Sequence, residues 1–141
     1  MASRSFGRLF TRQEADQLVP RLEVMLKAIQ RQARGLRTGL ENLVASNAAL
    51  AGLSLREVVE REPALRVQAA ALASVIEELE AFGCLLKDVD RGLVDFPARI
   101  GGKVAFLCWQ SGEPHVLAWH SLEAGFAGRQ PLPGAAKPLL N

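Results

Sequence analysis

The hydrophobic period of this chain changes at Gly83, and this change constrains the fold more than any other feature. Before Gly83, apolar residues recur at intervals of three, four or seven, as they do in amphipathic helices. After Gly83, apolar and polar residues alternate, which is typical of strands with one buried face. The sequence therefore predicts an α+β domain in which helices precede an antiparallel sheet.

The helical part is predicted to span residues 11–83. Thr11 and Ser54 are each followed three residues later by a glutamate, Glu14 and Glu57, and this capping-box pattern opens helices. The long apolar repeats after each box are joined by a short aperiodic segment. Residues 11–83 therefore predict a long antiparallel helical hairpin.

Residues 84–122 are predicted to form a three- to four-stranded antiparallel β-meander. The paired glycines 101–102 indicate a two-residue hairpin turn, which places Asp95 opposite Cys108. A four-residue loop at 111–114 then sets Phe106 beside Trp119 and leaves His120 on the face toward the helices. Residues 123–141, rich in glycine and proline, predict an irregular C-terminal tail, and we expect residues 1–141 to form one domain.

Composition narrows the class of protein. Hydrophobic residues make up 49% of the 141 residues and charged residues 23%, as in an ordinary globular protein. No apolar run is long enough to predict a membrane span, and we expect no signal peptide. The two cysteines are then expected to be free thiols in the cytoplasm. A net charge of +2 is too small to indicate nucleic-acid binding by itself.

A row of polar residues in the predicted sheet is a candidate metal site. Carboxylate, thiolate and imidazole groups bind divalent metals, and the candidate ligands are Asp88, Asp95, Cys108 and His120. Asp88 joins the row only if the turn before strand 93–100 has two residues, and His120 is expected on the other face. The alternative is that the aspartates shape turns and Cys108 is a small core residue.

A second candidate is a small-molecule pocket at the open end of the sheet. Its residues combine aromatic, acidic, imidazole and guanidinium groups: Trp109, Glu113, Trp119, His120 and Arg129. Arg129 could clamp a carboxylate or a phosphate. The alternative is that Arg129 forms an ion pair with Glu113 or Asp95, with both tryptophans in the core.

A third candidate is a basic stripe on the first helix. Lys27, Arg31, Arg34 and Arg37 lie in a stretch without an acidic residue from 24 to 40, so they could bind an anionic polymer or an acidic partner. No aromatic residue accompanies them as a stacking platform for nucleic acid. The alternative is a solvated helix face.

Three segments resemble one known family. They are FTRQEADQLVPRL at residues 10–22, GCLLKDVDRGLVDFP at 83–97 and LCWQSGEPHVLAWHSLEAGFAGR at 107–129. Together they resemble the prokaryotic family called domain of unknown function 2203. The resemblance covers most of the chain and supports one shared fold, but it implies no activity.

The leading functional hypothesis is a small cytoplasmic, non-catalytic interaction or ligand-binding module. We expect it to form a homodimer through its hairpin, because long leucine-bearing helices expose more apolar surface than one sheet covers. The alternative is a metal-binding protein or small enzyme that uses a divalent metal. Its residues are Asp88, Asp95, Cys108, Glu113 and His120. Binding of an anionic polymer or nucleic acid through the basic stripe is the third hypothesis.

Overall fold

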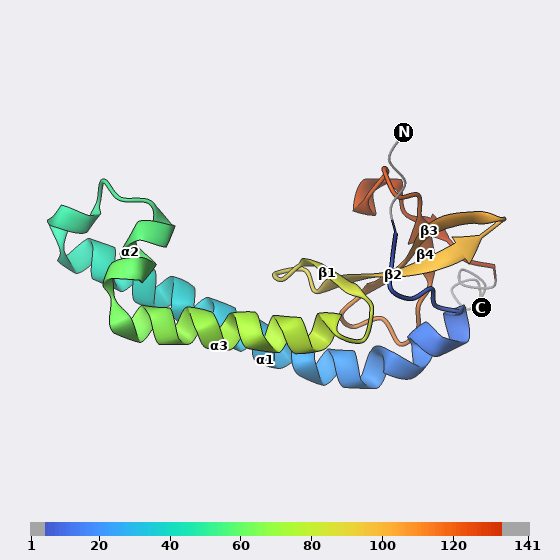
Figure 1. Cartoon of the computed structure of the whole chain (residues 1–141), viewed down its shortest axis with the longest axis horizontal. Helices are drawn as coiled ribbons and strands as arrows, with labels where there is room; N and C mark the ends of the chain where they lie inside the picture. Colours follow the sequence, from blue (N-terminus) through green and yellow to red (C-terminus); the bar gives the residue numbers. More distant parts are fainter. Residues whose placement is uncertain (1–4, 134–141) are drawn as a thin grey trace.

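A computed structural model describes residues 5–133 of the chain and shows an α+β fold (Figure 1). The helices are α1 (Arg12–Ser46), α2 (Leu55–Arg61) and α3 (Pro63–Glu80), with short 3-10 turns η1 (Ala48–Leu50) and η2 (Phe126–Gly128). The strands are β1 (Leu85–Asp88), β2 (Leu93–Ile100), β3 (Lys103–Gln110), β4 (Ala118–His120) and β5 (Gln130–Pro131). The predicted order of a helical hairpin followed by an antiparallel sheet is confirmed.

Both predicted capping boxes form. The Glu14 amide donates to Thr11 Oγ1 at 3.1 Å, and the Glu14 carboxylate accepts from the Thr11 amide at 2.8 Å. Ser54 and Glu57 repeat the arrangement at 3.2 and 2.9 Å. Each box satisfies two amides that a helix start would otherwise leave unpaired, so α1 and α2 begin where the sequence predicts.

The hairpin of α1 and α3 extends well beyond the sheet and ends at α2 (Figure 1). Its distal end has a small core of its own, which consists of Leu40, Leu50, Val58 and Leu65. The two long helices approach closely there, since a Cβ atom on Gly39 would lie 3.2 Å from Leu65 Cδ2. No helix among residues 5–133 is long and apolar enough to cross a membrane.

The two-residue turn between β2 and β3 sets the register of the sheet. Gly101 and Gly102 have φ angles of 59° and 80°, a conformation that glycine adopts without strain and most other residues rarely adopt. Asp95 pairs with Cys108, as predicted. The neighbouring residues on the opposite face point to the helices and fill the main core, and the largest are Val94, Phe96, Leu107 and Trp109.

The predicted register of the last main strand is wrong by one residue. Phe106 pairs with His120 instead of Trp119, and Cys108 pairs with Ala118. His120 therefore lies on the face away from the helices, and the prediction that it faces the helices is also wrong. Amides of the longer loop bond to α1 outside the ladder: the Gly112 amide donates to the Glu23 carboxylate and the Val116 amide to the Asp16 carboxylate.

The tail adds a strand that the sequence did not predict. β5 pairs with β4, so the sheet has five strands in the order β1-β2-β3-β4-β5 instead of three or four. The Leu132 amide donates to the Leu117 carbonyl at 2.9 Å and extends this contact. The first half of the predicted irregular tail is thus held to the sheet, while residues 134–141 lie outside the described part of the chain.

A polar stripe along α1 fixes the sheet to the helix. Its four members are spaced seven residues apart, so they lie on one side of the helix: Asp16, Glu23, Gln30 and Arg37. Asp16 and Glu23 accept from backbone amides of the β3–β4 loop at 2.7 and 2.8 Å. Gln30 and Arg37 bind the β1–β2 turn at 3.0 and 3.1 Å.

We expect Gly92→Ala to destabilise the protein by about 2 kcal/mol or more. Gly92 has a φ of 68°, and a Cβ atom there would lie 2.6 Å from the Ser111 Cβ. Urea unfolding measures the change. The matched control is Gly35→Ala, where no atom lies within 4 Å and helix propensity predicts a gain of about 1 kcal/mol. Equal stability of the two variants would contradict this account of the turn.

Candidate metal centre

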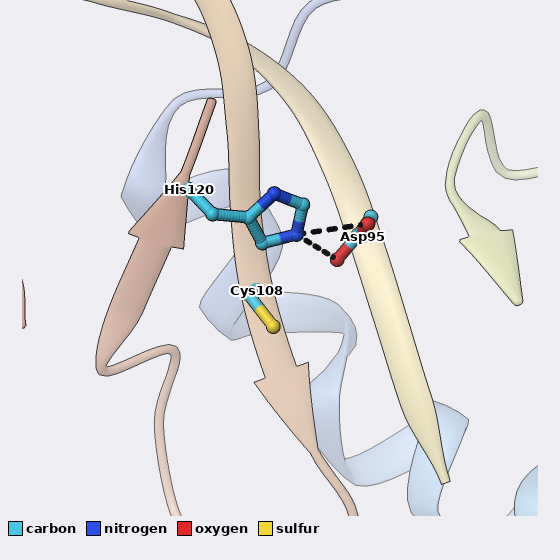
Figure 2. Close-up of side chains that lie close together, drawn as sticks. All are labelled: Asp95, Cys108 and His120. Carbon is cyan, nitrogen blue, oxygen red and sulfur yellow. Dashed lines mark hydrogen bonds and ion pairs between the residues drawn. The ribbon is translucent and has the colours of Figure 1, made fainter. Parts of the chain in front are cut away.

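Three adjacent strands bring Asp95, Cys108 and His120 together on the face of the sheet that points away from the helices (Figure 2). Their exposed fractions are 3%, 1% and 2%. One ligand atom from each residue lies within 4.8 Å of the others. The imidazole starts on β4 and reaches across β3 toward the carboxylate on β2.

The hydrogen bonds of His120 define which ring nitrogen carries a proton. Nδ1 lies 2.7 Å from the backbone oxygen of Ser121, and a carbonyl can only accept, so Nδ1 is the donor. Nε2 lies 3.0 Å from both carboxylate oxygens of Asp95. In a neutral ring, the Nε2 lone pair would face these oxygens. A proton or a metal cation must therefore lie between Nε2 and the carboxylate.

This arrangement matches the way proteins prepare a histidine to bind a metal. Metal-binding histidines donate the second ring N–H to a carbonyl or carboxylate, which fixes the tautomer and the ring orientation. The Ser121 carbonyl does this for His120. Nε2, a carboxylate oxygen of Asp95 and Cys108 Sγ then form one group of nitrogen, oxygen and sulfur donors.

The thiol environments disfavour a free thiolate at neutral pH. Burial raises the pKa of Cys108 to about 12, the charge of Asp95 raises it as well, and Arg129 opposes both. Burial also raises the pKa of Cys84 to about 11. Cys84 instead donates to the Leu79 carbonyl at 3.5 Å. Without a cation beside it, neither thiol has the low pKa of a reactive cysteine.

A cavity of about 140 Å³ opens beside the three residues. Its remaining walls include Lys87 and four apolar side chains: Leu93, Phe106, Leu122 and Phe126. Lys87 is exposed, and its Nζ lies 5.2 Å from the centre of the Phe106 ring. The polar cluster therefore faces a small, mostly apolar space with one ammonium group at its edge.

Asp88 does not join the cluster. Leu85 is the residue of β1 that pairs with Asp95, and after a register shift between Leu86 and Asp88 the Asp88 residue pairs with Leu93, two positions along β2 from Asp95. The turn that follows has four residues, and the Asp88 carboxylate accepts from the Arg91 amide within it at 2.9 Å. Asp88 thus shapes the reversal of the chain, as the alternative interpretation of this residue expects.

The five residues of the candidate pocket are divided between the two faces of the sheet, although the Trp109 Nε1–H donates to the Glu113 carbonyl at 2.9 Å. Trp109 is fully buried on the helix side of the sheet, where Trp119 also packs, while His120 is on the opposite side. Glu113 and Arg129 form an ion pair, and Arg129 also donates to the Cys108 carbonyl at 3.3 Å. The structure therefore shows the predicted alternative in which Arg129 ties the tail to the sheet.

The four basic residues of α1 divide into two groups. Arg37 belongs to the polar stripe and pairs with Asp90 at 3.1 Å, and Lys27 pairs with Glu23 at 3.9 Å. Arg31 and Arg34 are exposed and form no ion pair within residues 5–133. The continuous basic surface expected from the sequence is thus reduced by two pairings.

Three further residues of this site were not predicted from the sequence: Lys87, Ser121 and Phe126. Lys87 follows Leu85 by two residues, and Leu85 pairs with Asp95, so strand alternation could have placed Lys87 on the same face. Ser121 contributes only its carbonyl, and Phe126 reaches the cavity through an irregular segment. No local pattern in the sequence indicates either contact.

The fold and this buried cluster define an α+β domain with a candidate metal centre in its sheet. Residues 8–132 match the model of the family described as "Uncharacterized conserved protein (DUF2203)", and the chain belongs to this family. The description names no activity. No curated protein and no solved structure matches the chain.

We expect Arg129→Ala to lower the free energy of unfolding by about 1–3 kcal/mol, because it leaves the Glu113 carboxylate largely buried without its cation. Chemical denaturation measures this loss. Arg129→Lys is the control, since it keeps the charge but lacks the planar guanidinium, and it should recover part of the stability. Unchanged stability of Arg129→Ala would contradict a structural role for the pair.

Proposed function

We propose that the protein binds a divalent transition-metal ion through Asp95, Cys108 and His120. The observation that carries this proposal is the contact between Nε2 of His120 and both oxygens of Asp95 while Nδ1 is committed to the Ser121 carbonyl. A cation at Nε2 satisfies all these groups at once. The buried thiol of Cys108 beside the pair adds a third donor, which an imidazolium–carboxylate ion pair alone does not use.

Zinc fits this donor set best. Zn²⁺ accepts thiolate, imidazole and carboxylate ligands in one tetrahedral site. Bond lengths of about 2.0–2.1 Å place a nitrogen and an oxygen ligand about 3.3 Å apart, close to the 3.0 Å between His120 and Asp95. The same geometry needs about 3.6 Å between the sulfur and the nitrogen. In the structure these two atoms lie within 4.8 Å of each other, so metal binding draws the Cys108 thiol inward by at most about 1 Å.

Three protein ligands leave a fourth tetrahedral position for water or a small ligand, as in zinc sites that act on substrates. The 140 Å³ cavity lies beside the cluster and provides the space for this position. We therefore infer a metal-dependent ligand-binding module. The free thiols of Cys84 and Cys108 fit a reducing compartment, and we propose a cytoplasmic location.

We expect the protein, purified without a histidine tag, to bind one equivalent of Zn²⁺. Elemental analysis gives the stoichiometry, and calorimetric titration after chelation gives the affinity. Cys108→Ala should weaken binding at least about 100-fold, because it removes a direct ligand. Zn²⁺ should also raise the melting temperature of the wild type, since binding to the folded state alone stabilises it.

Cys84→Ala is the matched control, because Cys84 is also a buried free cysteine but lies outside the cluster. It should retain the wild-type affinity for zinc. Absence of stoichiometric zinc and no shift of the melting temperature would overturn the proposal. Asp95 and His120 would then form a buried ion pair that holds β2 to β4.

We also propose that the hairpin forms a homodimer. Only two residues of α3 are buried, and the apolar side chains along it are half-buried or exposed: Val67, Leu72, Val75 and Ile76. Arg31 and Arg34 are exposed on α1, and Glu77 and Glu78 on α3, so a second copy offers both apolar and opposite charged groups. Charge complementarity of this kind supports self-association.

We expect the purified protein to sediment as a dimer and the Val67→Glu variant as a monomer. Val67 is 70% exposed in the single chain, and burying a carboxylate in its place at an interface is unfavourable. Analytical ultracentrifugation across a concentration series measures the change. Gln130→Glu adds the same charge at an exposed position on the sheet and should remain dimeric. A monomeric wild type at all concentrations would contradict this proposal.

A further inference from the structure

The cavity beside Asp95, Cys108 and His120 has walls that indicate what kind of ligand it binds. We propose that it binds a short-chain monocarboxylate, with the carboxylate between the metal ion and the Lys87 ammonium group and the alkyl part against the apolar wall. This inference rests on the metal site proposed above. It adds a ligand class and assigns Lys87 as a specificity-determining residue.

The charges of the site require one negative charge from the ligand. A divalent ion with two anionic ligands, Asp95 and Cys108, and a neutral His120 has no net charge. The charge of the nearby Arg129 is balanced by Glu113. Lys87 adds one positive charge at the cavity, and it forms no ion pair within residues 5–133. A monoanion neutralises this charge, whereas a dianion leaves an excess negative charge in a partly apolar space.

The size and lining of the cavity select a small, partly apolar anion. A volume of about 140 Å³ holds several water molecules, or an organic anion of about four to six non-hydrogen atoms. Leu93, Phe106, Leu122 and Phe126 supply hydrocarbon and aromatic surface for an alkyl group. Inorganic monoanions fill the polar end alone, and nucleotides are too large for the space.

Lys87 is held where it can contact such a ligand. Its strand, β1, pairs with β2 so that Leu85 lies opposite Asp95, and Lys87 follows on the same face. The ammonium group lies 5.2 Å from the Phe106 ring centre, a cation–π distance that keeps the side chain over the cavity wall. The ring and the ammonium therefore lie next to each other in the lining of the cavity.

The test uses the full-length protein loaded with Co²⁺, whose visible absorption reports changes of coordination. Propionate and acetate should change this spectrum saturably, propionate more tightly, while the neutral analogue propionamide should not. Lys87→Met keeps the length of the side chain but removes the charge, and it should weaken propionate binding about tenfold. The thiolate-to-cobalt charge-transfer band should be unchanged in this variant.

Lys103→Met is the control, because Lys103 is exposed on β3 and does not line the cavity. A cobalt protein that shows the thiolate band but does not respond to carboxylates overturns the ligand assignment and leaves the metal site intact. A protein without that band overturns both. Equal propionate affinity of Lys87→Met and Lys103→Met overturns the role of Lys87.

Discussion

The two-residue turn between β2 and β3 is the constraint on which the rest of the structure depends. Because side chains alternate along a strand, the register that this turn fixes decides the face of every residue at once. It directs Phe96, Leu107 and Trp109 to the helices and places Asp95 beside Cys108 on the other face. A shift of one strand by a single residue would direct its apolar side chains away from the helical core and its polar ones into it. The core and the polar cluster are therefore two consequences of one register.

Elements whose signals are local could be predicted from the sequence. The capping boxes at Thr11 and Ser54 and the turn at residues 101–102 each depend on neighbours within a few residues, and all three are confirmed. The register of β4 could not be predicted in this way. The loop before β4 contacts residues far away in the sequence, such as Asp16, which accepts a hydrogen bond from the Val116 amide one hundred residues later. Because the predicted register was wrong by one residue, His120 was predicted on the wrong face. The sequence therefore indicated a possible histidine ligand but not that it lies beside Asp95 and Cys108.

The polar stripe of α1 shows why the basic residues were also misassigned in part. Helical periodicity places Arg37 about one turn from Arg34. The sequence contains no sign that a turn of the sheet lies against Arg37. In the structure, Asp90 of the β1–β2 turn takes the charge of Arg37. The polar stripe binds the β1–β2 turn and the β3–β4 loop. Its residues therefore stabilise the fold. Polar residues that are exposed to solvent and polar residues that contact the sheet recur along a helix with the same spacing. Only the tertiary structure therefore distinguishes them.

The burial of Asp95 and His120 is relevant to function as well as to stability. Removing two charged groups from water costs several kcal/mol, and an apolar pair of similar size often stabilises a fold as well or better. Stability alone therefore does not account for a carboxylate, an imidazole and a thiol that are each 3% exposed or less in the centre of a sheet. A bound cation does account for them, because it interacts favourably with all three donors and needs their exclusion from water to bind tightly. On the opposite face, the same three strands are filled by apolar side chains, and this contrast across one sheet supports the proposed metal site.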